Sequence, residues 1–204
     1  MKNRLIGIYN PTIILTYIGV FCAVLGMGLL HGAEADRLDT AMILLIVSGV
    51  CDLFDGLVAR QFKRTEQEKQ FGIQLDSLAD TVSLVVFPAT ILMTVAGINV
   101  LSAAVACFYV FAGIMRLGWF NVTTEENKGF YQGLPVTFAA GLIPLCYLIL
   151  KLTVPVVMAA VFPVIFACIG LLFILNFKMK KPGLKVLIVV TLVAVAVIIG
   201  LLLV

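Results

Sequence analysis

The sequence predicts an all-α fold, a polytopic bundle of transmembrane helices, and three observations lead to this fold class. Of the 204 residues, 62% are hydrophobic and only 12% are charged, whereas a soluble domain has about 45–50% apolar and about 25% charged residues. The apolar residues fall into seven runs, and each run is close to the roughly 20 residues that a helix needs to cross a bilayer. Polar residues gather in the short connections between the runs.

The seven runs follow one another along almost the whole chain, so we expect one integral membrane domain, residues 1–204. The first run continues past the length of a signal-peptide core and lacks a small-residue cleavage site, which favours a retained span. The expected spans are residues 10–30, 38–59, 71–96, 98–120, 134–150, 154–177 and 186–204. Pro88, Pro144 and Pro163 lie inside spans, where the carbonyls they free must find other partners.

The positions of the basic residues predict the orientation in the membrane. If the N-terminus is cytoplasmic and the spans alternate, only Arg37 and Lys151 lie outside. The cytoplasmic side then has Lys2, Arg4, Arg60, Lys63, Arg64, Lys69, Arg116, Lys128, Lys178, Lys180, Lys181 and Lys185. This bias follows the positive-inside rule and predicts a multi-pass protein of the cell membrane. A basic inner face favours anionic headgroups and phosphorylated substrates, and the chain has no soluble basic domain for nucleic acid.

The polar residues are concentrated in three connections on the predicted cytoplasmic side, residues 61–70, 121–133 and 177–185. We therefore expect the chemistry of the protein at this membrane face. The five cysteines all lie in apolar spans and form no C-x-x-C pair. They are interpreted as small buried hydrophobic residues rather than as metal ligands.

Four aspartates near this face are the strongest indication of function. Asp52 and Asp55 lie near the end of the second span, and Asp76 and Asp80 lie near the start of the third. Carboxylates at such positions are costly and indicate a functional site. Spacings of three and four residues place each pair on one helix face. Because the two spans are antiparallel neighbours, all four carboxylates can converge below the inner membrane surface.

Four converging carboxylates predict a site for divalent cations. Without a cation their charges would repel one another, and some of the groups would have to take up protons. Oxygen ligands without histidine or cysteine favour a hard ion, Mg²⁺ or Mn²⁺. Such ions usually complete their coordination with substrate phosphates.

The neighbouring residues favour a phosphate-bearing substrate. Gly56 would let a ligand approach the helix backbone closely. Arg60 lies a little over one helical turn beyond Asp55 and can pair with a phosphate. Lys69 and Gly72 precede the second pair of aspartates.

The pattern resembles the motif of the CDP-alcohol phosphatidyltransferase family, D-x-x-D-G-x-x-A-R followed by G-x-x-x-D-x-x-x-D. The motif positions are filled by Asp52, Asp55, Gly56, Ala59, Arg60, Gly72, Asp76 and Asp80. The spacer, residues 61–71, has eleven residues, where the family usually has eight, which indicates a longer cytoplasmic loop. Relatives have a serine or threonine that helps hold the CDP group three residues before the second glycine, and this chain has Lys69 there.

Further segments are similar to the phosphatidylserine synthase branch of that family. They are DSLAD at 76–80, FPA at 87–89, RLGWFN at 116–121 and FYQGLPV at 130–136. The similarity extends from about residue 8 to residue 185. It implies a six-helix core, to which this chain adds a seventh C-terminal span, and a homodimer.

The resemblance also implies an activity, the transfer of a phosphatidyl group from CDP-diacylglycerol to L-serine with release of CMP. It assigns Asp52, Asp55 and Asp76 as the principal metal ligands, and Asp80 as the general base, which also contacts a metal ion. It places Gly56 and Arg60 at the CDP group, with Lys69 as a further diphosphate contact. We expect Arg116 and Asn121 to bind serine, although an arginine that anchors the membrane interface is the alternative for Arg116. All residue numbers are those of the printed sequence.

Two other functions remain open from the sequence. A relative that uses glycerol 3-phosphate or inositol phosphate as the acceptor would perform the same chemistry, but it would need a more cationic pocket. A transporter of divalent cations or protons would also have carboxylates in its spans. The aspartates lie near one face rather than at the midplane, and the sequence shows no inverted repeat, so the transporter is the remoter alternative.

Overall fold

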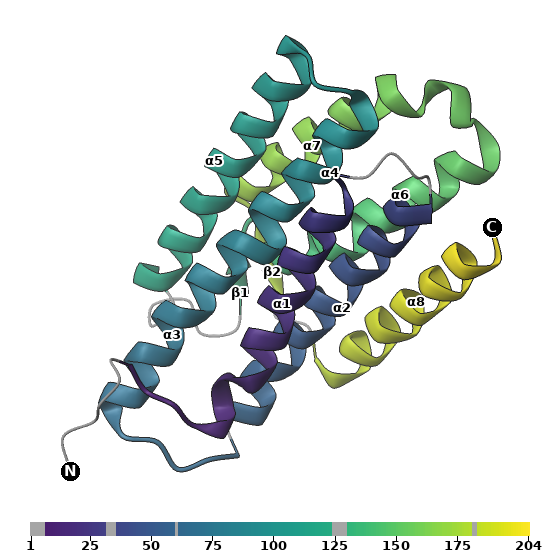
Figure 1. The fold of residues 1–204 in the computed structure, drawn as a ribbon. Helices are drawn as coiled ribbons and strands as arrows, with labels where there is room; N and C mark the ends of the chain where they lie inside the picture. The colour runs from purple at the N-terminus through teal and green to yellow at the C-terminus, as the bar shows by residue number, and fades with distance from the viewer. Residues whose placement is uncertain (1–6, 32–35, 60, 124–129, 181–182) are drawn as a thin grey trace.

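The computed structural model describes residues 7–31, 36–59, 61–123, 130–180 and 183–204. In this part of the chain, seven helices are long and apolar enough to cross a membrane. They run side by side as a bundle (Figure 1), which confirms the predicted fold class. The observed spans are 11–29, 37–59, 66–96, 100–123, 136–153, 155–174 and 185–203.

The elements follow the chain in a simple up-and-down order. The helices are α1 (Ile14–Leu29), α2 (Asp36–Ala59), α3 (Glu66–Asp80), α4 (Phe87–Ala96), α5 (Val100–Thr123), α6 (Ala139–Thr153), α7 (Met158–Ile174) and α8 (Leu184–Leu203). The short 3-10 segments are η1 (Pro11–Ile13), η3 (Val136–Phe138) and η4 (Pro155–Val157), and a π-helical segment, η2 (Thr81–Val86), joins α3 to α4. Two short strands are β1 (Phe130–Gln132) and β2 (Lys178–Lys180).

The third span begins earlier than the apolar pattern predicts, at Glu66 rather than at residue 71. Its first turn is polar and is stabilised by a capping box. The Thr65 hydroxyl accepts a hydrogen bond from the Glu68 backbone N–H at 3.3 Å, and the Glu68 carboxylate accepts one from the Thr65 N–H at 2.7 Å. Capping satisfies backbone donors that the helix leaves unpaired. The helix can therefore begin before the apolar run, with charged residues in its first turn.

The π-helical segment η2 follows Asp80 directly and precedes Pro88. Proline has no N–H to donate to the carbonyl four residues before it, which here belongs to Leu84. The Tyr109 hydroxyl of α5 donates to that carbonyl at 3.1 Å. The carbonyl freed by Pro88 therefore has a partner, as the sequence analysis expected. Short π segments inside helices occur frequently at functional sites, and this one begins directly after Asp80, the last of the four aspartates.

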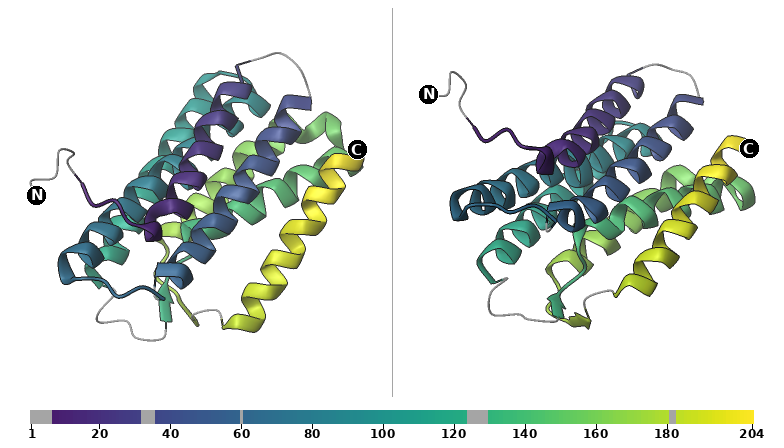
Figure 2. Two further views of the ribbon diagram at one scale, coloured as in Figure 1. Left: turned by 60° about the horizontal axis from the view of Figure 1, so that its bottom comes forward. Right: turned by 90° about the horizontal axis from the view of Figure 1, so that it is seen from below.

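Two of the polar connections pair with each other at one end of the bundle. β1 and β2 form an antiparallel two-stranded ribbon in which Tyr131 lies opposite Met179. Figure 2 shows the ribbon at the same end as the starts of α3 and α8. The ribbon was not predicted, because each strand has only three residues and its partner is 48 positions away in the chain. The two connections that contain these strands lie at the same end of the bundle, as the predicted alternation of the spans requires.

Gly133 closes this ribbon against α7. Its N–H donates to the Phe177 carbonyl at 2.8 Å, and its φ is +72°, in the region that favours glycine. A Cβ atom there would lie 2.8 Å from the Phe173 carbonyl oxygen. The chain can therefore turn sharply at this point and lead directly into η3 and α6.

The helices approach closely through small residues, as is usual where lipid rather than water surrounds a bundle. Gly49 of α2 lies so close to Ala140 of α6 that a Cβ atom at position 49 would overlap the Ala140 methyl group. At the end of the bundle away from the β1–β2 ribbon, Asp39 of α2 accepts hydrogen bonds from Tyr147 at 2.9 Å and from Lys151 at 2.7 Å. These contacts hold α2 and α6 together over their length.

The last helix, α8, lies at the edge of the bundle beside α2 and α6 (Figure 1). In the most apolar stretch of this span, only 17% of the residues are buried, compared with 56% in the span that contains α3 and α4. A helix that is apolar on all sides and mostly unburied fits contact with lipid. The other six spans form the packed core of the bundle, with α8 as the predicted addition.

Candidate functional site: a carboxylate cluster at one end of the bundle

The second and third spans bring the predicted aspartates together. The carboxylates of Asp52, Asp76 and Asp80 each offer an oxygen atom, and these three oxygens all lie within 4.8 Å of one another. Asp80 is buried, while Asp52 and Asp76 are half-buried. The i, i+3 spacing on α2 and the i, i+4 spacing on α3 put each pair on the face turned toward the other helix.

Asp55 completes the cluster from the side of α2. Its carboxylate interacts with that of Asp76, and the carboxylate of Asp52 interacts with that of Asp80. Two unit charges about 4 Å apart repel by about 4 kcal/mol at an effective dielectric constant of about 20. Several such pairs would cost a large part of a typical folding free energy. The cluster therefore needs positive charge or protons.

A hard divalent cation fits this set of donors. Two ligand oxygens on opposite sides of Mg²⁺ are about 4.2 Å apart, because each lies about 2.1 Å from the ion. Oxygens within 4.8 Å of one another need only small side-chain movements to share such an ion. The donors are carboxylates, which suit Mg²⁺ or Mn²⁺, so the structure contains an acidic group able to bind a metal ion.

Two threonines that the sequence analysis did not single out contact the α2 carboxylates. The Thr16 hydroxyl of α1 donates to Asp55 Oδ2 at 3.1 Å. The Thr137 hydroxyl of η3 donates to Asp52 Oδ2 at 2.6 Å. Both threonines lie far from the aspartates in the sequence, and threonine is common in membrane spans. The segment that is similar to a known branch, residues 130–136, ends one residue before Thr137, so neither threonine had a signal in the sequence.

The other residues expected at the substrate lie around the same end. Gly56 is exposed, and among the described residues no atom lies within 4 Å of the position that a Cβ atom would take. The backbone of α2 is thus open beside Asp55. Lys69 is exposed in the first turns of α3 and pairs with Glu66 at 3.3 Å. It lies two turns, about 10 Å, before Asp76 along the helix axis. Arg60 lies outside the described residues.

The two residues expected to bind serine have partners inside the protein. Arg116 is 5% exposed, and its Nε–H donates to the Leu134 carbonyl at 3.1 Å. Its guanidinium carbon lies 5.5 Å from the centre of the Phe120 ring. Asn121 exchanges hydrogen bonds with Ser77, at 3.1 Å and 2.9 Å, and Ser77 adjoins Asp76 on α3. Asn121 therefore connects α5 to the carboxylate-bearing helix, while Arg116 supports the turn that precedes η3.

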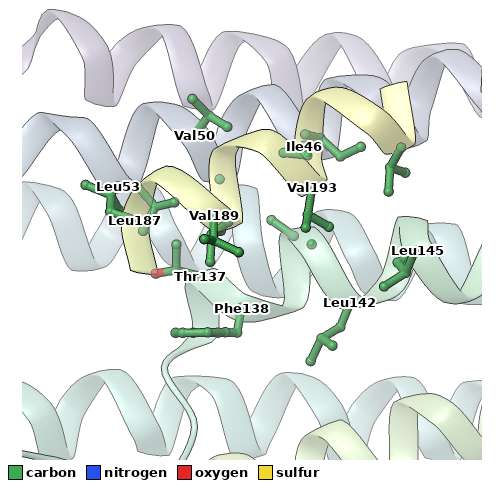
Figure 3. Close-up of a pocket in the computed structure, with 16 residues that line it drawn as sticks. Ile46, Val50, Leu53, Thr137, Phe138, Leu142, Leu145, Leu187, Val189 and Val193 are labelled. Atoms are coloured by element: carbon green, nitrogen blue, oxygen red, sulfur yellow. The ribbon is translucent and has the colours of Figure 1, made fainter. Parts of the chain in front are cut away.

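An apolar groove of about 180 Å³ opens between α2, α6 and α8. Its walls include Ile46 and Leu53 of α2, Leu142 of α6, and Val193 of α8. Thr137 lies at one end of the groove, near Leu53 and Leu187 (Figure 3). The same threonine donates to Asp52, so the end of the groove and the carboxylates share a residue.

Comparison with known proteins identifies the family. The model of the CDP-alcohol phosphatidyltransferase family matches residues 10–204. The chain belongs to this family. The carboxylate cluster contains Asp52, Asp76 and Asp80, three of the aspartates on which the resemblance to this family was based.

Individual relatives are similar over parts of the chain. A Helicobacter pylori protein named CDP-diacylglycerol–serine O-phosphatidyltransferase is 35% identical over 128 residues, 61% of this chain and 53% of the relative. An archaetidylserine synthase of Methanothermobacter thermautotrophicus is 38% identical over 112 residues, 54% of this chain and 47% of the relative. A Bacillus subtilis protein with the same name as the first is 27% identical over 162 residues, 78% of this chain and 84% of the relative. The alignments thus span about half the length of the first two relatives.

Proposed function

We propose that this chain transfers the phosphatidyl group of CDP-diacylglycerol to L-serine, releasing CMP and forming phosphatidylserine. The observation that carries the proposal is the convergence of Asp52, Asp76 and Asp80 oxygens within 4.8 Å in a chain of this family. The names of its relatives, which specify serine as the acceptor or archaetidylserine as the product, support the choice of alcohol.

In this proposal Asp52, Asp55 and Asp76 are the principal ligands of Mg²⁺ or Mn²⁺. Asp80, whose carboxylate oxygen lies within 4.8 Å of those of Asp52 and Asp76, also contacts a metal ion. Such cations, when bound, neutralise phosphate charge and stabilise a leaving oxygen. The open backbone at Gly56 gives the diphosphate room to approach α2. Arg60 and Lys69 supply positive charge on the side of the nucleotide.

Asp80 is the proposed general base. The serine hydroxyl oxygen forms a bond to the lipid-side phosphorus while the bond from that phosphorus to the oxygen of CMP breaks. Asp80 accepts the hydroxyl proton, and CMP leaves with the bonding electron pair on its phosphate oxygen. The burial of Asp80 supports this role, because a base must be held within hydrogen-bonding reach of the proton it removes.

The groove between α2, α6 and α8 is the proposed position of a lipid acyl chain. Its lining is almost entirely apolar, and it ends at Thr137, which contacts Asp52. A diacylglycerol chain placed there would remain in an apolar environment while its phosphate reached the carboxylates. The nucleotide would then face the aqueous end of the bundle.

Arg116 and Asn121 remain the proposed contacts for serine. Serine offers a carboxylate, which suits a buried guanidinium, and Asn121 lies next to the metal-binding helix through Ser77. We expect Arg116→Ala to raise the serine KM far more than the CDP-diacylglycerol KM. If both KM values and the thermal stability change together, Arg116 acts only as a support for the turn at Leu134.

We further propose that the whole chain acts as a single catalytic domain and as a homodimer in the cell membrane. The end of the bundle with the β1–β2 ribbon would face the cytoplasm, because the basic residues gather there. Light scattering of the purified protein, corrected for detergent, measures the oligomeric state. A monomer at all concentrations would contradict the proposed dimer.

The function is tested by supplying purified protein with CDP-diacylglycerol, Mn²⁺ and one alcohol at a time, and measuring CMP release. We expect serine to stimulate release well above the level with water, glycerol 3-phosphate or inositol phosphate. Stimulation by one of the phosphorylated alcohols alone would retain the chemistry but reassign the acceptor. Cation or proton flux in proteoliposomes without CMP release would favour the transporter instead.

A further inference from the structure

The two α2 carboxylates are each bonded by a threonine from a different part of the bundle. Thr137 approaches Asp52 from η3, and Thr16 approaches Asp55 from α1. A carboxylate has two oxygens, so a threonine bonded to one of them leaves the other available for a cation. Each threonine therefore restricts how the carboxylate that it bonds can rotate.

The position of Thr137 is fixed by several helices. It follows the turn at Gly133 and Leu134, whose N–H groups donate to carbonyls of Phe177 and Leu172, at 2.8 Å and 3.0 Å. The Leu134 carbonyl in turn accepts from Arg116 of α5 at 3.1 Å. The orientation of Asp52 therefore depends on a turn that α5 and α7 hold in place.

The position of Thr16 is fixed at the start of α1. The Asn10 side chain caps η1 by accepting from the Thr12 backbone N–H at 3.1 Å, which sets where the first helix begins. Close packing between α1 and α2 then determines the register. The Ser48 hydroxyl, one turn before Asp52, donates to the Gly19 carbonyl at 3.0 Å. These contacts consequently hold Thr16 beside Asp55.

We propose that Thr137 and Thr16 are positioning residues that hold Asp52 and Asp55 in the orientation needed to bind a divalent cation. This inference rests on the proposed function and deepens it. Threonine has a stiff χ1, and hydrogen bonds behind a metal ligand are commonly worth about 10–100-fold in metal affinity. The shorter bond, from Thr137, carries the larger share.

Matched substitutions separate the hydroxyl from the shape of the side chain. Thr137→Val keeps the branched shape that lines the apolar groove but removes the hydroxyl, whereas Thr137→Ser keeps the hydroxyl and removes the methyl group. Binding of Mn²⁺ to each purified variant is measured by the loss of the electron paramagnetic resonance signal of free Mn²⁺. This measurement does not depend on turnover.

We expect Thr137→Val to weaken Mn²⁺ binding by about 10–100-fold and Thr137→Ser to bind nearly as the original chain does. Thr16→Val should show a smaller loss, which Thr16→Ser restores. Thr94→Val is the control, because the Thr94 hydroxyl donates to the Thr90 carbonyl within α4, away from the carboxylates. The control should bind Mn²⁺ normally.

The outcomes distinguish this inference from the function on which it rests. If the original chain binds no Mn²⁺, the proposed metal site itself is wrong. If the original chain binds Mn²⁺ and both valine variants bind it equally well, the positioning role is overturned and the metal site stands. Thr16→Val supplies an independent test on another helix should Thr137→Val fail to fold.

Discussion

The four aspartates of the cluster differ in what surrounds them. Asp52 and Asp55 of α2 accept hydrogen bonds from threonine hydroxyls. Asp76 and Asp80 of α3 interact with the carboxylates of α2. A cation bound between the two helices would offset the charge of both pairs.

The first prediction at this scale concerns stability. Asp76→Asn removes one charge from a set of carboxylates that repel one another, so we expect a higher melting temperature than that of the original chain in EDTA. The same variant should lose the stabilisation that Mn²⁺ gives the original chain, because it loses a ligand. Thermal unfolding in detergent, with and without Mn²⁺, measures both effects.

Asp39→Asn is the matched control, an identical substitution on α2 at the other end of the bundle. It removes the ion pair with Lys151, so it should lower stability in both conditions and leave the Mn²⁺ effect intact. Asp76 is not a ligand if Mn²⁺ stabilises Asp76→Asn as strongly as the original chain.

The second prediction concerns the proposed base. Asp80→Asn cannot accept a proton, so we expect kcat for serine-dependent CMP release to fall by about 10²–10⁴-fold, the usual contribution of a general base. The KM for CDP-diacylglycerol should change much less. A kcat within a few-fold of the original value would remove Asp80 from the proton transfer.

At the scale of the elements, α2 is the helix around which the site is built. It contacts α1 through Ser48, α6 through Gly49, and α3 through the aspartates. Gly49 lies one turn before Asp52 and allows α2 to approach α6 closely enough for Thr137 to reach that carboxylate. The spacing between helices is therefore part of the site.

Gly49→Ala tests this dependence. The added methyl group would overlap Ala140, so the two helices must separate, and we expect both a lower melting temperature and weaker Mn²⁺ binding. Gly28→Ala is the control, because among the described residues no atom lies within 4 Å of its added Cβ. Normal Mn²⁺ binding by Gly49→Ala would show that the site tolerates a wider spacing.

The sequence predicts the elements that a repeated pattern specifies and misses those that depend on distant partners. The seven spans follow from runs of apolar residues, and the pairing of carboxylates follows from helical periodicity. The β1–β2 ribbon, the π segment and the two threonine contacts could not be predicted. Each depends on residues that only the folded chain brings together, such as Thr137 and Asp52, which lie 85 positions apart.

At the scale of the whole molecule, the bundle has two different ends. One end contains the ribbon, the charged start of α3 and the opening beside Gly56, while the other contains the short turn near Ile98, which is 84% exposed. The carboxylates lie toward the first end, where a water-soluble nucleotide can enter from the aqueous side. The apolar groove lies between α2, α6 and α8. This arrangement suits a reaction between a lipid and a soluble alcohol.

Single cysteines in a cysteine-free background test the proposed orientation. We expect an impermeant maleimide to label Ile98→Cys in intact cells and to label Lys178→Cys only after the cells are opened. Both side chains are exposed, and they lie at the two ends of the bundle. The reverse pattern would place the active site on the outer face and contradict the proposed localisation.

The most direct test of the central claim is the position of Mn²⁺ in crystals of the protein soaked with that ion. Anomalous scattering from manganese locates the ion without reference to activity. We expect a peak between the carboxylates of Asp52, Asp76 and Asp80, with Asp55 beside it. A peak elsewhere, with none at these carboxylates when the ion saturates the protein, would contradict the proposed metal site.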